Sequence, residues 1–244
     1  MLNRLCRVLV LTTLGLLASC GGGSNNGSVI NVAGNWQFTA NSTVFGFSYT
    51  AAGQVNQNGS SVSGTLTLSG TPCAQSANFT GSLSGNKLTA TLDENGQSTM
   101  YTGTVAADGN SGSGTYQSPA GGCTDGDAGT FSGQRLSMLN GIFVGSFGPA
   151  NSIPANVVTE LHDDGGNVTG GATITNSLCF HSLNVAGKVS GFNVELQGAD
   201  ADQSQTITFH GTFDPREHSL PLTYSVLGGG CSGETGAARL RLVK

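Results

Sequence analysis

One short segment of the chain, HDDGGN at residues 162–167, places an imidazole beside two carboxylates. Such a group could bind a hard cation such as calcium, which takes six or more oxygen ligands. The segment lacks the regular ligand spacing of a calcium loop, and the comparable segment NQNG at residues 56–59 is a plain hairpin turn. We therefore predict a turn at residues 162–167 and no metal site.

The other three histidines, His181, His210 and His218, are the remaining candidates for proton transfer. Nucleophilic catalysis requires a serine or cysteine beside a histidine, with a carboxylate to orient the ring. On the predicted strand at 206–213, His210 shares a face with two threonines and lies opposite the apolar side chains, while His218 lies in the turn DPREHS. No G-x-S-x-G segment stands between a strand and a helix. We predict that the chain is not an enzyme and needs no cofactor.

The elements that position these residues are predicted to be strands. Apolar and polar residues alternate along segments such as 61–69 and 77–84, which indicates half-buried β-strands. Turn dipeptides such as Asn58-Gly59 and Asp108-Gly109 separate the segments at hairpin spacing. About eight strands are expected in each half of the chain, and no helix is expected beyond the first 20 residues.

The beginning of the chain has the pattern of a secretory signal. Arg4 and Arg7 precede an uncharged apolar run that ends at Ala18, and this run is shorter than the roughly 20 residues of a transmembrane helix. The residues Leu17-Ala18-Ser19-Cys20 then resemble the lipobox of bacterial lipoproteins. The alternative is an ordinary signal peptide with an incidental cysteine.

The lipoprotein resemblance implies a cellular location for the protein. Residues 1–19 would be removed, Cys20 would carry the lipid, and residues 20–32 would form a flexible Gly/Ser/Asn-rich tether. Several acyl chains hold a protein on a bilayer where one chain alone binds only marginally. Gly21, in place of an aspartate after the lipidated cysteine, favours the outer membrane if the host has two membranes. The expected location is therefore the bacterial cell envelope, with the membrane as a partner through Cys20.

The two halves of the chain are similar in sequence. The matched segments are VSGTLTLSGTPC with VTGGATITNSLC, and YTGTV with FHGTF. Their starts also correspond, as Gly34-Asn35-Trp36 and Gly141-Ile142-Phe143. Two homologous domains are therefore predicted, at residues 33–137 and 138–244.

Each predicted domain contains one early and one late cysteine: Cys73, Cys123, Cys179 and Cys231. An even number of cysteines in an exported chain predicts two disulfides. A duplicated unit most simply closes its own bridge, which pairs Cys73 with Cys123 and Cys179 with Cys231. Each bridge closes a loop of about 50 residues and should contribute roughly 3 to 4 kcal/mol by the chain-entropy argument.

The predicted fold class is all-β, with two tandem homologous eight-stranded antiparallel meander barrels and one disulfide in each. Closure of each sheet into a barrel removes the exposed strand edges. The alternative to two barrels is two β-sandwiches. Glycines recur at predicted inward positions: Gly64, Gly81, Gly103, Gly170, Gly187 and Gly211. We interpret them as kinks in a small coiled barrel, and the alternative is that they leave room for a ligand inside it.

Gly34-Asn35-Trp36, with Arg135 near the end of the last strand, resembles the pattern of the calycins, the lipocalins and avidins. The resemblance implies that the tryptophan packs under the arginine and that the barrel binds a small ligand. The second domain departs from the pattern because Phe143 replaces the tryptophan.

Composition limits the possible partners. Charged residues make up 9% of the chain and the formal net charge is −5, which argues against nucleic acid as a partner because phosphate binding needs a basic surface. Two function classes remain. One is a lipid-anchored envelope binding protein that captures a small ligand or a protein partner, and the other is a structural or assembly component of the envelope.

The two classes predict different structures. A binding protein should have a cavity or an exposed aromatic patch, and a structural component should have filled interiors and uniform polar surfaces. The candidate ligand-binding residues are the aromatic side chains near the start of the first domain: Trp36, Phe45, Phe47 and Tyr49.

Overall fold

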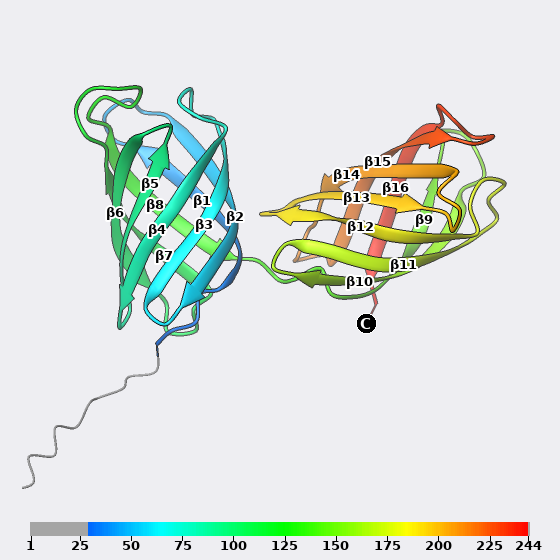
Figure 1. Cartoon of the computed structure of the whole chain (residues 1–244), viewed down its shortest axis with the longest axis horizontal. Coiled ribbons are helices and arrows are strands. Elements are labelled where there is room, and N and C mark those ends of the chain that lie inside the picture. The colour runs from blue at the N-terminus through cyan, green and yellow to red at the C-terminus, as the bar shows by residue number, and fades with distance from the viewer. Residues whose placement is uncertain (1–28, 244) are drawn as a thin grey trace, which may run out of the picture.

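The computed structural model describes residues 29–243, so the predicted signal segment and the predicted lipidation at Cys20 lie outside the described residues. Within that range the chain forms sixteen β-strands, and no helix there is long and apolar enough to cross a membrane. The strands form two closed antiparallel barrels, which we call barrel 1 and barrel 2 (Figure 1).

Barrel 1 consists of β1 (Gly34–Ser42), β2 (Ser48–Asn58), β3 (Ser61–Ser69), β4 (Ser76–Ser84), β5 (Lys87–Glu94), β6 (Gln97–Val105), β7 (Ser111–Gln117) and β8 (Ala128–Arg135). Barrel 2 consists of β9 (Gly141–Gly148), β10 (Ala155–Asp164), β11 (Asn167–Thr175), β12 (Ser182–Ser190), β13 (Asn193–Ala199), β14 (Gln205–Thr212), β15 (Ser219–Gly228) and β16 (Thr235–Leu242). The predicted all-β class and the eight strands of each repeat are confirmed.

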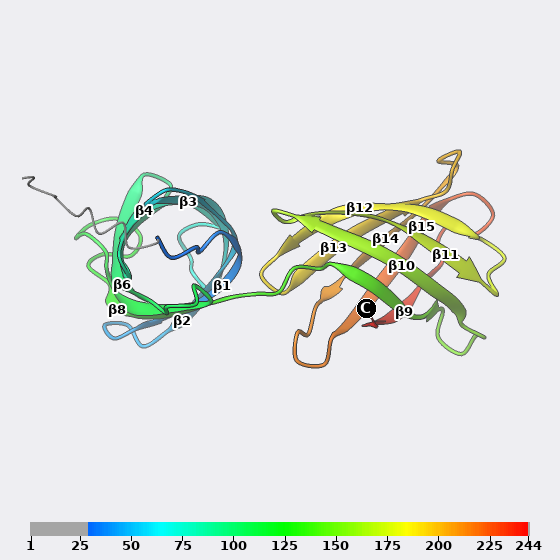
Figure 2. The same ribbon diagram turned by 90° about the horizontal axis from the view of Figure 1, so that it is seen from below.

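Each barrel is a simple meander that closes when its last strand pairs with its first. Trp36 on β1 lies opposite Arg135 on β8, and Phe143 on β9 lies opposite Leu242 on β16. Figure 2 looks along the axis of barrel 1, where the strands form a complete ring, while barrel 2 is seen from the side. Closure confirms the barrel prediction over the sandwich alternative.

The interior of each barrel is mostly apolar and the outer face is mostly polar. Along β10, alternate residues are buried and exposed from Ala155 to Asp164, as a period of two requires. Phe143, Leu161 and Ile207 are completely buried in the core of barrel 2. This pattern is the reverse of a membrane-spanning barrel, which carries its apolar residues on the outside.

The inward-facing glycines let neighbouring strands approach closely. A Cβ atom added to Gly64 would overlap the carbonyl oxygen of Gln54, and one added to Gly170 would overlap that of Glu160. The other four inward glycines would also place a Cβ against the backbone of the next strand. Their role is therefore to permit tight coiling of the barrel, which agrees with the interpretation as kinks.

Both disulfides join loops at one end of their own barrel, which we call its disulfide end. Cys73, in the β3–β4 loop, pairs with Cys123 in the β7–β8 loop, with a Cα–Cα distance of 5.5 Å. Cys179 pairs with Cys231 between the matching loops of barrel 2, at 6.0 Å. Both distances are normal for a disulfide, and the predicted pairing is confirmed.

Candidate functional site

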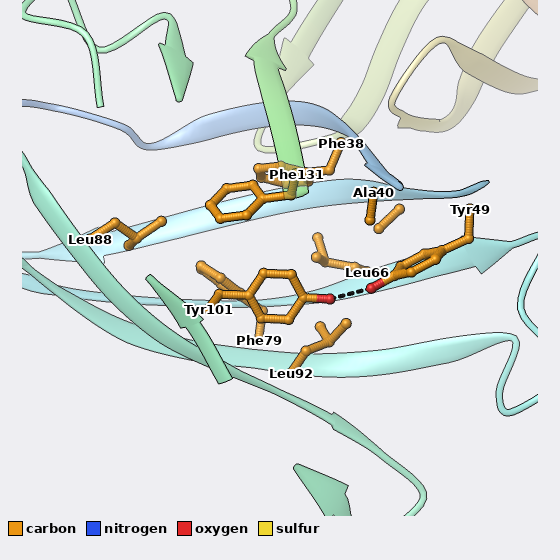
Figure 3. Close-up of a pocket in the computed structure, with 10 residues that line it drawn as sticks. Phe38, Ala40, Tyr49, Leu66, Phe79, Leu88, Leu92, Tyr101 and Phe131 are labelled. Atoms are coloured by element: carbon orange, nitrogen blue, oxygen red, sulfur yellow. Dashed lines mark hydrogen bonds between the residues drawn. The ribbon is translucent and has the colours of Figure 1, made fainter. Parts of the chain in front are cut away.

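The interiors of both barrels are filled by side chains. In barrel 1 a void of about 30 Å³ lies among apolar residues that include Phe38, Leu66 and Phe131 (Figure 3). Barrel 2 contains a void of the same size. Such a space has room for about two water molecules, whereas pockets for small ligands begin at roughly 300 Å³. A ligand of ordinary size must therefore bind outside these interior voids.

Trp36 lies apart from the other three predicted aromatic residues. It is 3% exposed, its ring stacks on Phe38 at 5.4 Å, and its indole N–H donates to the carbonyl oxygen of Val32 at 2.7 Å. Arg135, opposite Trp36 in the sheet, donates from its guanidinium to Asn110 Oδ1. Trp36 is a core residue near the end of barrel 1 where β1 begins, and it is not available to a ligand.

Phe45, Phe47 and Tyr49 come together at the disulfide end of barrel 1, and we call this group the aromatic mouth. Phe45 is 54% exposed and stacks on Phe47, with ring centroids 6.2 Å apart. Phe47 is half-buried and contacts Tyr49, which is buried inside the barrel. The aromatic contacts continue inward from Tyr49 to Tyr116 and from Tyr116 to Tyr101. An exposed aromatic surface is thus connected to a buried aromatic core.

A buried polar layer lies beneath the aromatic mouth. Asp127 is 1% exposed and accepts hydrogen bonds from Ser42 Oγ at 2.6 Å and from the Tyr116 hydroxyl at 2.8 Å. The hydroxyls of Tyr49 and Tyr101 bond to each other, as the dashed line in Figure 3 shows. Burial raises the pKa of all three tyrosines above the ordinary value of 10.0, so they are neutral hydrogen-bonding groups at physiological pH.

Glu94 belongs to the same end of the barrel and is a buried carboxyl group with an unpaired oxygen. It is 6% exposed, and its Oε2 atom has no hydrogen-bond partner among the described residues. Burial raises the pKa of Glu94 above its ordinary value of 4.5 because the carboxylate form loses its hydration. Barrel 1 therefore keeps an ionisable group in a position that costs it stability at neutral pH.

Replacing Glu94 by glutamine is expected to increase the free energy of unfolding at pH 7 by about 1 to 2 kcal/mol, because the neutral amide avoids the burial of a charge. Because the pKa of Glu94 is raised in the folded state, the folded protein gains stability relative to the unfolded chain as Glu94 becomes protonated. The advantage of Glu94→Gln should therefore shrink as the pH falls toward and below 4.5. Urea unfolding at several pH values measures this, with exposed Glu217→Gln as the control. An equal gain at every pH would contradict the explanation.

Barrel 2 shows that the fold does not need the polar layer. Phe209 in barrel 2 takes the place of Tyr101, and Ala155 takes the place of Tyr49. Only the hydrogen bond of the third tyrosine has a counterpart there, because the Tyr224 hydroxyl donates to Glu234 at 2.7 Å. The tyrosine and carboxylate cluster is therefore a property of barrel 1 and not a requirement of this barrel type.

The segment at residues 162–167 forms the predicted turn between β10 and β11. Asp163 Oδ1 accepts the backbone N–H of Gly166 at 2.8 Å, and Asp163 Oδ2 accepts that of Leu139 at 3.2 Å. His162 is exposed beside Glu160. The carboxylate of Asp163 is thus used to hold the turn and the segment that links the barrels.

The remaining candidates for chemistry lie apart from one another. His210 is exposed on the outer face of β14, with Nδ1 3.7 Å from Glu195. Within residues 29–243, the one group with metal-ligand spacing is Cys179, Cys231 and Glu234, and its two sulfur atoms form a disulfide. No arrangement of a nucleophile, a base and an orienting acid is found among the described residues.

The two barrels touch at the β12–β13 turn, which lies against β1 and β2 (Figure 1). The side-chain amide of Asn35 donates to the carbonyl oxygen of Gly191 and accepts its N–H, both at 2.7 Å. Ser190 Oγ donates to the carbonyl oxygen of Ala52. A Cβ atom at Gly191 would overlap Ala52 and Gln37, so only glycine fits at this contact. We call this contact the junction.

Comparisons with known proteins give little further information. No family model matches the chain, and no curated protein matches it. Among solved structures it is similar to the crystal structure of a putative outer membrane protein from Bacteroides fragilis, at 13% sequence identity and a TM-score of 0.31. That match covers 87% of this chain and 98% of the other. A likeness at this level carries no argument about function.

Proposed function

We propose that the protein is a lipid-anchored, non-catalytic binding protein of the bacterial cell envelope, which captures a protein partner at the aromatic mouth of barrel 1. The observation that carries the proposal is the exposure of Phe45, stacked on Phe47, above a polar layer that barrel 2 lacks. Exposed aromatic residues are typical of protein-binding surfaces. The filled interiors favour a partner that binds outside the barrel over a small ligand held within it.

The direction of β1 supports a binding surface that faces away from the membrane. Strand β1 begins at Gly34, just after the segment predicted to be the tether, and ends at Ser42 beside the aromatic mouth. A strand of this length spans about 30 Å. An anchor at Cys20 would hold one end of barrel 1 toward the membrane and leave the aromatic mouth at the opposite end. The lipobox and the signal pattern before it support the anchor itself.

A structural role in the envelope is the second candidate. The filled interiors and the polar outer faces are what a spacer would have. The aromatic mouth distinguishes the two proposals, because a spacer has no use for an exposed Phe45. Both proposals share the anchor at Cys20.

A photo-crosslinking amino acid placed at Phe45 in the full chain, in living cells, tests the proposal. We expect one discrete adduct in the membrane fraction, because the partner covers the aromatic mouth. Val158, which is 50% exposed on the outer face of β10, is the matched control position and should give no adduct. Cys20→Ser should release the chain and its adduct from the membranes.

Two further results decide between the candidates. Phe47→Ala removes the ring on which Phe45 stacks and should abolish the adduct if the mouth is the binding surface. The same faint adducts at positions 45 and 158, or no adduct at either, would leave the spacer as the better account.

A further inference from the structure

A cleft of about 520 Å³ lies beside the junction, between the outer face of barrel 1 and the β12–β13 turn of barrel 2. Its floor is formed by β1, β7 and β8, and Phe192 from barrel 2 forms its other wall. This volume is within the range of small-molecule sites, in contrast to the interior voids. The cleft contains none of the residues of the aromatic mouth.

The floor of the cleft is a regular array of neutral polar groups. Gln37 on β1 is directly opposite Gln134 on β8, and Thr39 is opposite Ser132 in the same ladder. Neighbouring strands are about 4.8 Å apart and successive outward residues of one strand are about 6.8 Å apart, so the two amides lie within the width of one sugar ring and the two hydroxyls lie one step further along the floor. Amides both donate and accept hydrogen bonds, as hydroxyls do. Among the described residues these four side chains have no hydrogen bond to another side chain.

Phe192 supplies the apolar wall of the cleft. It is half-buried, its carbonyl oxygen accepts the N–H of Phe213 at 2.9 Å, and it follows Gly191, which the side chain of Asn35 holds on both sides. The backbone that carries the ring is therefore held beside the floor before any ligand arrives. The face of an aromatic ring is electron-rich and favours C–H groups that carry a slight positive charge.

The charge of the cleft excludes most other ligands. None of its lining residues is acidic, basic or a histidine. Arg135, next to Gln134, donates its guanidinium hydrogen bonds to Asn110 Oδ1 and to the carbonyl oxygens of Ala33 and Asn31. A phosphate-bearing ligand needs free cations, and the lining of the cleft has none. An added peptide strand needs an open sheet edge, and both sheets are closed.

From these contacts we infer that the cleft binds a neutral saccharide. The apolar face of a pyranose ring packs on Phe192, and its hydroxyls bond to the amides of Gln37 and Gln134. The hydroxyls of Thr39 and Ser132 add hydrogen bonds along the floor, so that a second ring can follow. This site is separate from the aromatic mouth and does not depend on the function proposed for it.

The test is an array of immobilised oligosaccharides, neutral and acidic, probed with the purified full chain. Titration calorimetry on the best free tetrasaccharide then measures the affinity. We expect retention on neutral glycans with weak affinity, and Phe192→Ala should weaken binding at least tenfold. Gln134→Ala, an exposed substitution that leaves the fold intact, should weaken it several-fold. Gln117→Ala, an exposed glutamine at the other end of β7 and β8, is the matched control and should change nothing.

Three outcomes would overturn the inference. The first is no retention on any neutral glycan, and the second is a preference for acidic glycans. The third is binding that survives both Phe192→Ala and Gln134→Ala. Phe45→Ala tells the two sites apart. Saccharide binding that is lost in Phe45→Ala and kept in Phe192→Ala belongs to the aromatic mouth, and this result refutes the cleft site alone.

Discussion

Replacing Cys73 and Cys123 together by alanine is expected to lower the free energy of unfolding of barrel 1 by roughly 3 to 4 kcal/mol. The bridge closes a loop with a sequence separation of 50, and its loss restores the entropy of that loop to the unfolded chain. For a domain of this size such a loss lowers the melting temperature by about 15 °C or more. Trp36 is the chain's single tryptophan and is buried in barrel 1, so its fluorescence reports the unfolding of that barrel.

The matched control is the double replacement of Cys179 and Cys231, which closes a loop of nearly the same length in barrel 2. It should leave the Trp36 transition almost unchanged, because the barrels are separate closed sheets. If instead either double replacement shifts the Trp36 transition equally, the barrels unfold as one unit and the junction couples them more strongly than its few hydrogen bonds suggest.

At alkaline pH, barrel 1 is expected to unfold before barrel 2. Burial raises the pKa of Tyr49, Tyr101 and Tyr116 in barrel 1, and of Tyr224 in barrel 2, above the ordinary value of 10.0. The unfolded chain therefore loses these protons first, and stability falls as the pH rises above 10. Each buried tyrosine contributes about 1.4 kcal/mol per pH unit. Barrel 1, with three tyrosines, should lose about 4 kcal/mol per unit.

Trp36 fluorescence and tyrosinate absorbance, followed together during an alkaline titration, measure this. Most tyrosinate should form in the same narrow pH range in which Trp36 becomes exposed. Tyr101→Phe should make the transition of barrel 1 less steep, since it removes one of the three buried protons, and Phe209 shows that a phenylalanine fits the equivalent position. Tyrosinate that forms near pH 10 while Trp36 stays buried would contradict the prediction.

The fold could be predicted in detail because its signals are local. The turn at Asn58-Gly59 and the alternation from Val62 to Leu68 act through neighbouring residues, and both have the predicted structure. The duplication also predicted a contact between residues far apart in the chain, the pairing of each early cysteine with the late cysteine of the same repeat. Closure into barrels followed from the need to remove strand edges.

The candidate sites were harder to predict because they depend on residues far apart in the chain. Phe45, Phe47 and Tyr49 were identified by aromatic density, but Trp36, chosen for the same reason, is buried in the core near the opposite end of the barrel. Tyr101 has an inward position in its strand, yet nothing local places its hydroxyl against that of Tyr49. The polar layer could have been found only by comparing the inward positions of the two repeats.

The junction illustrates the same limit. Asn35 and Gly191 are 156 residues apart, and nothing in the Gly34-Asn35-Trp36 pattern or around Gly191 predicts that they meet. The cleft exists only because this contact sets the β12–β13 turn beside β8. Gln37, Gln134, Thr39 and Ser132 look like ordinary surface residues when each strand is considered alone.

The pairing of first and last strands also sets the order in which the chain can be completed. Barrel 1 can close once β8, which ends at Arg135, is available to pair with β1. Barrel 2 can close only when β16 (Thr235–Leu242) is available to pair with β9. When the homologous strands β9–β16 emerge, the edges of barrel 1 are already occupied. Closure of barrel 1 before the strands of barrel 2 are available would protect the tandem repeat against strand exchange, a characteristic failure of repeat proteins.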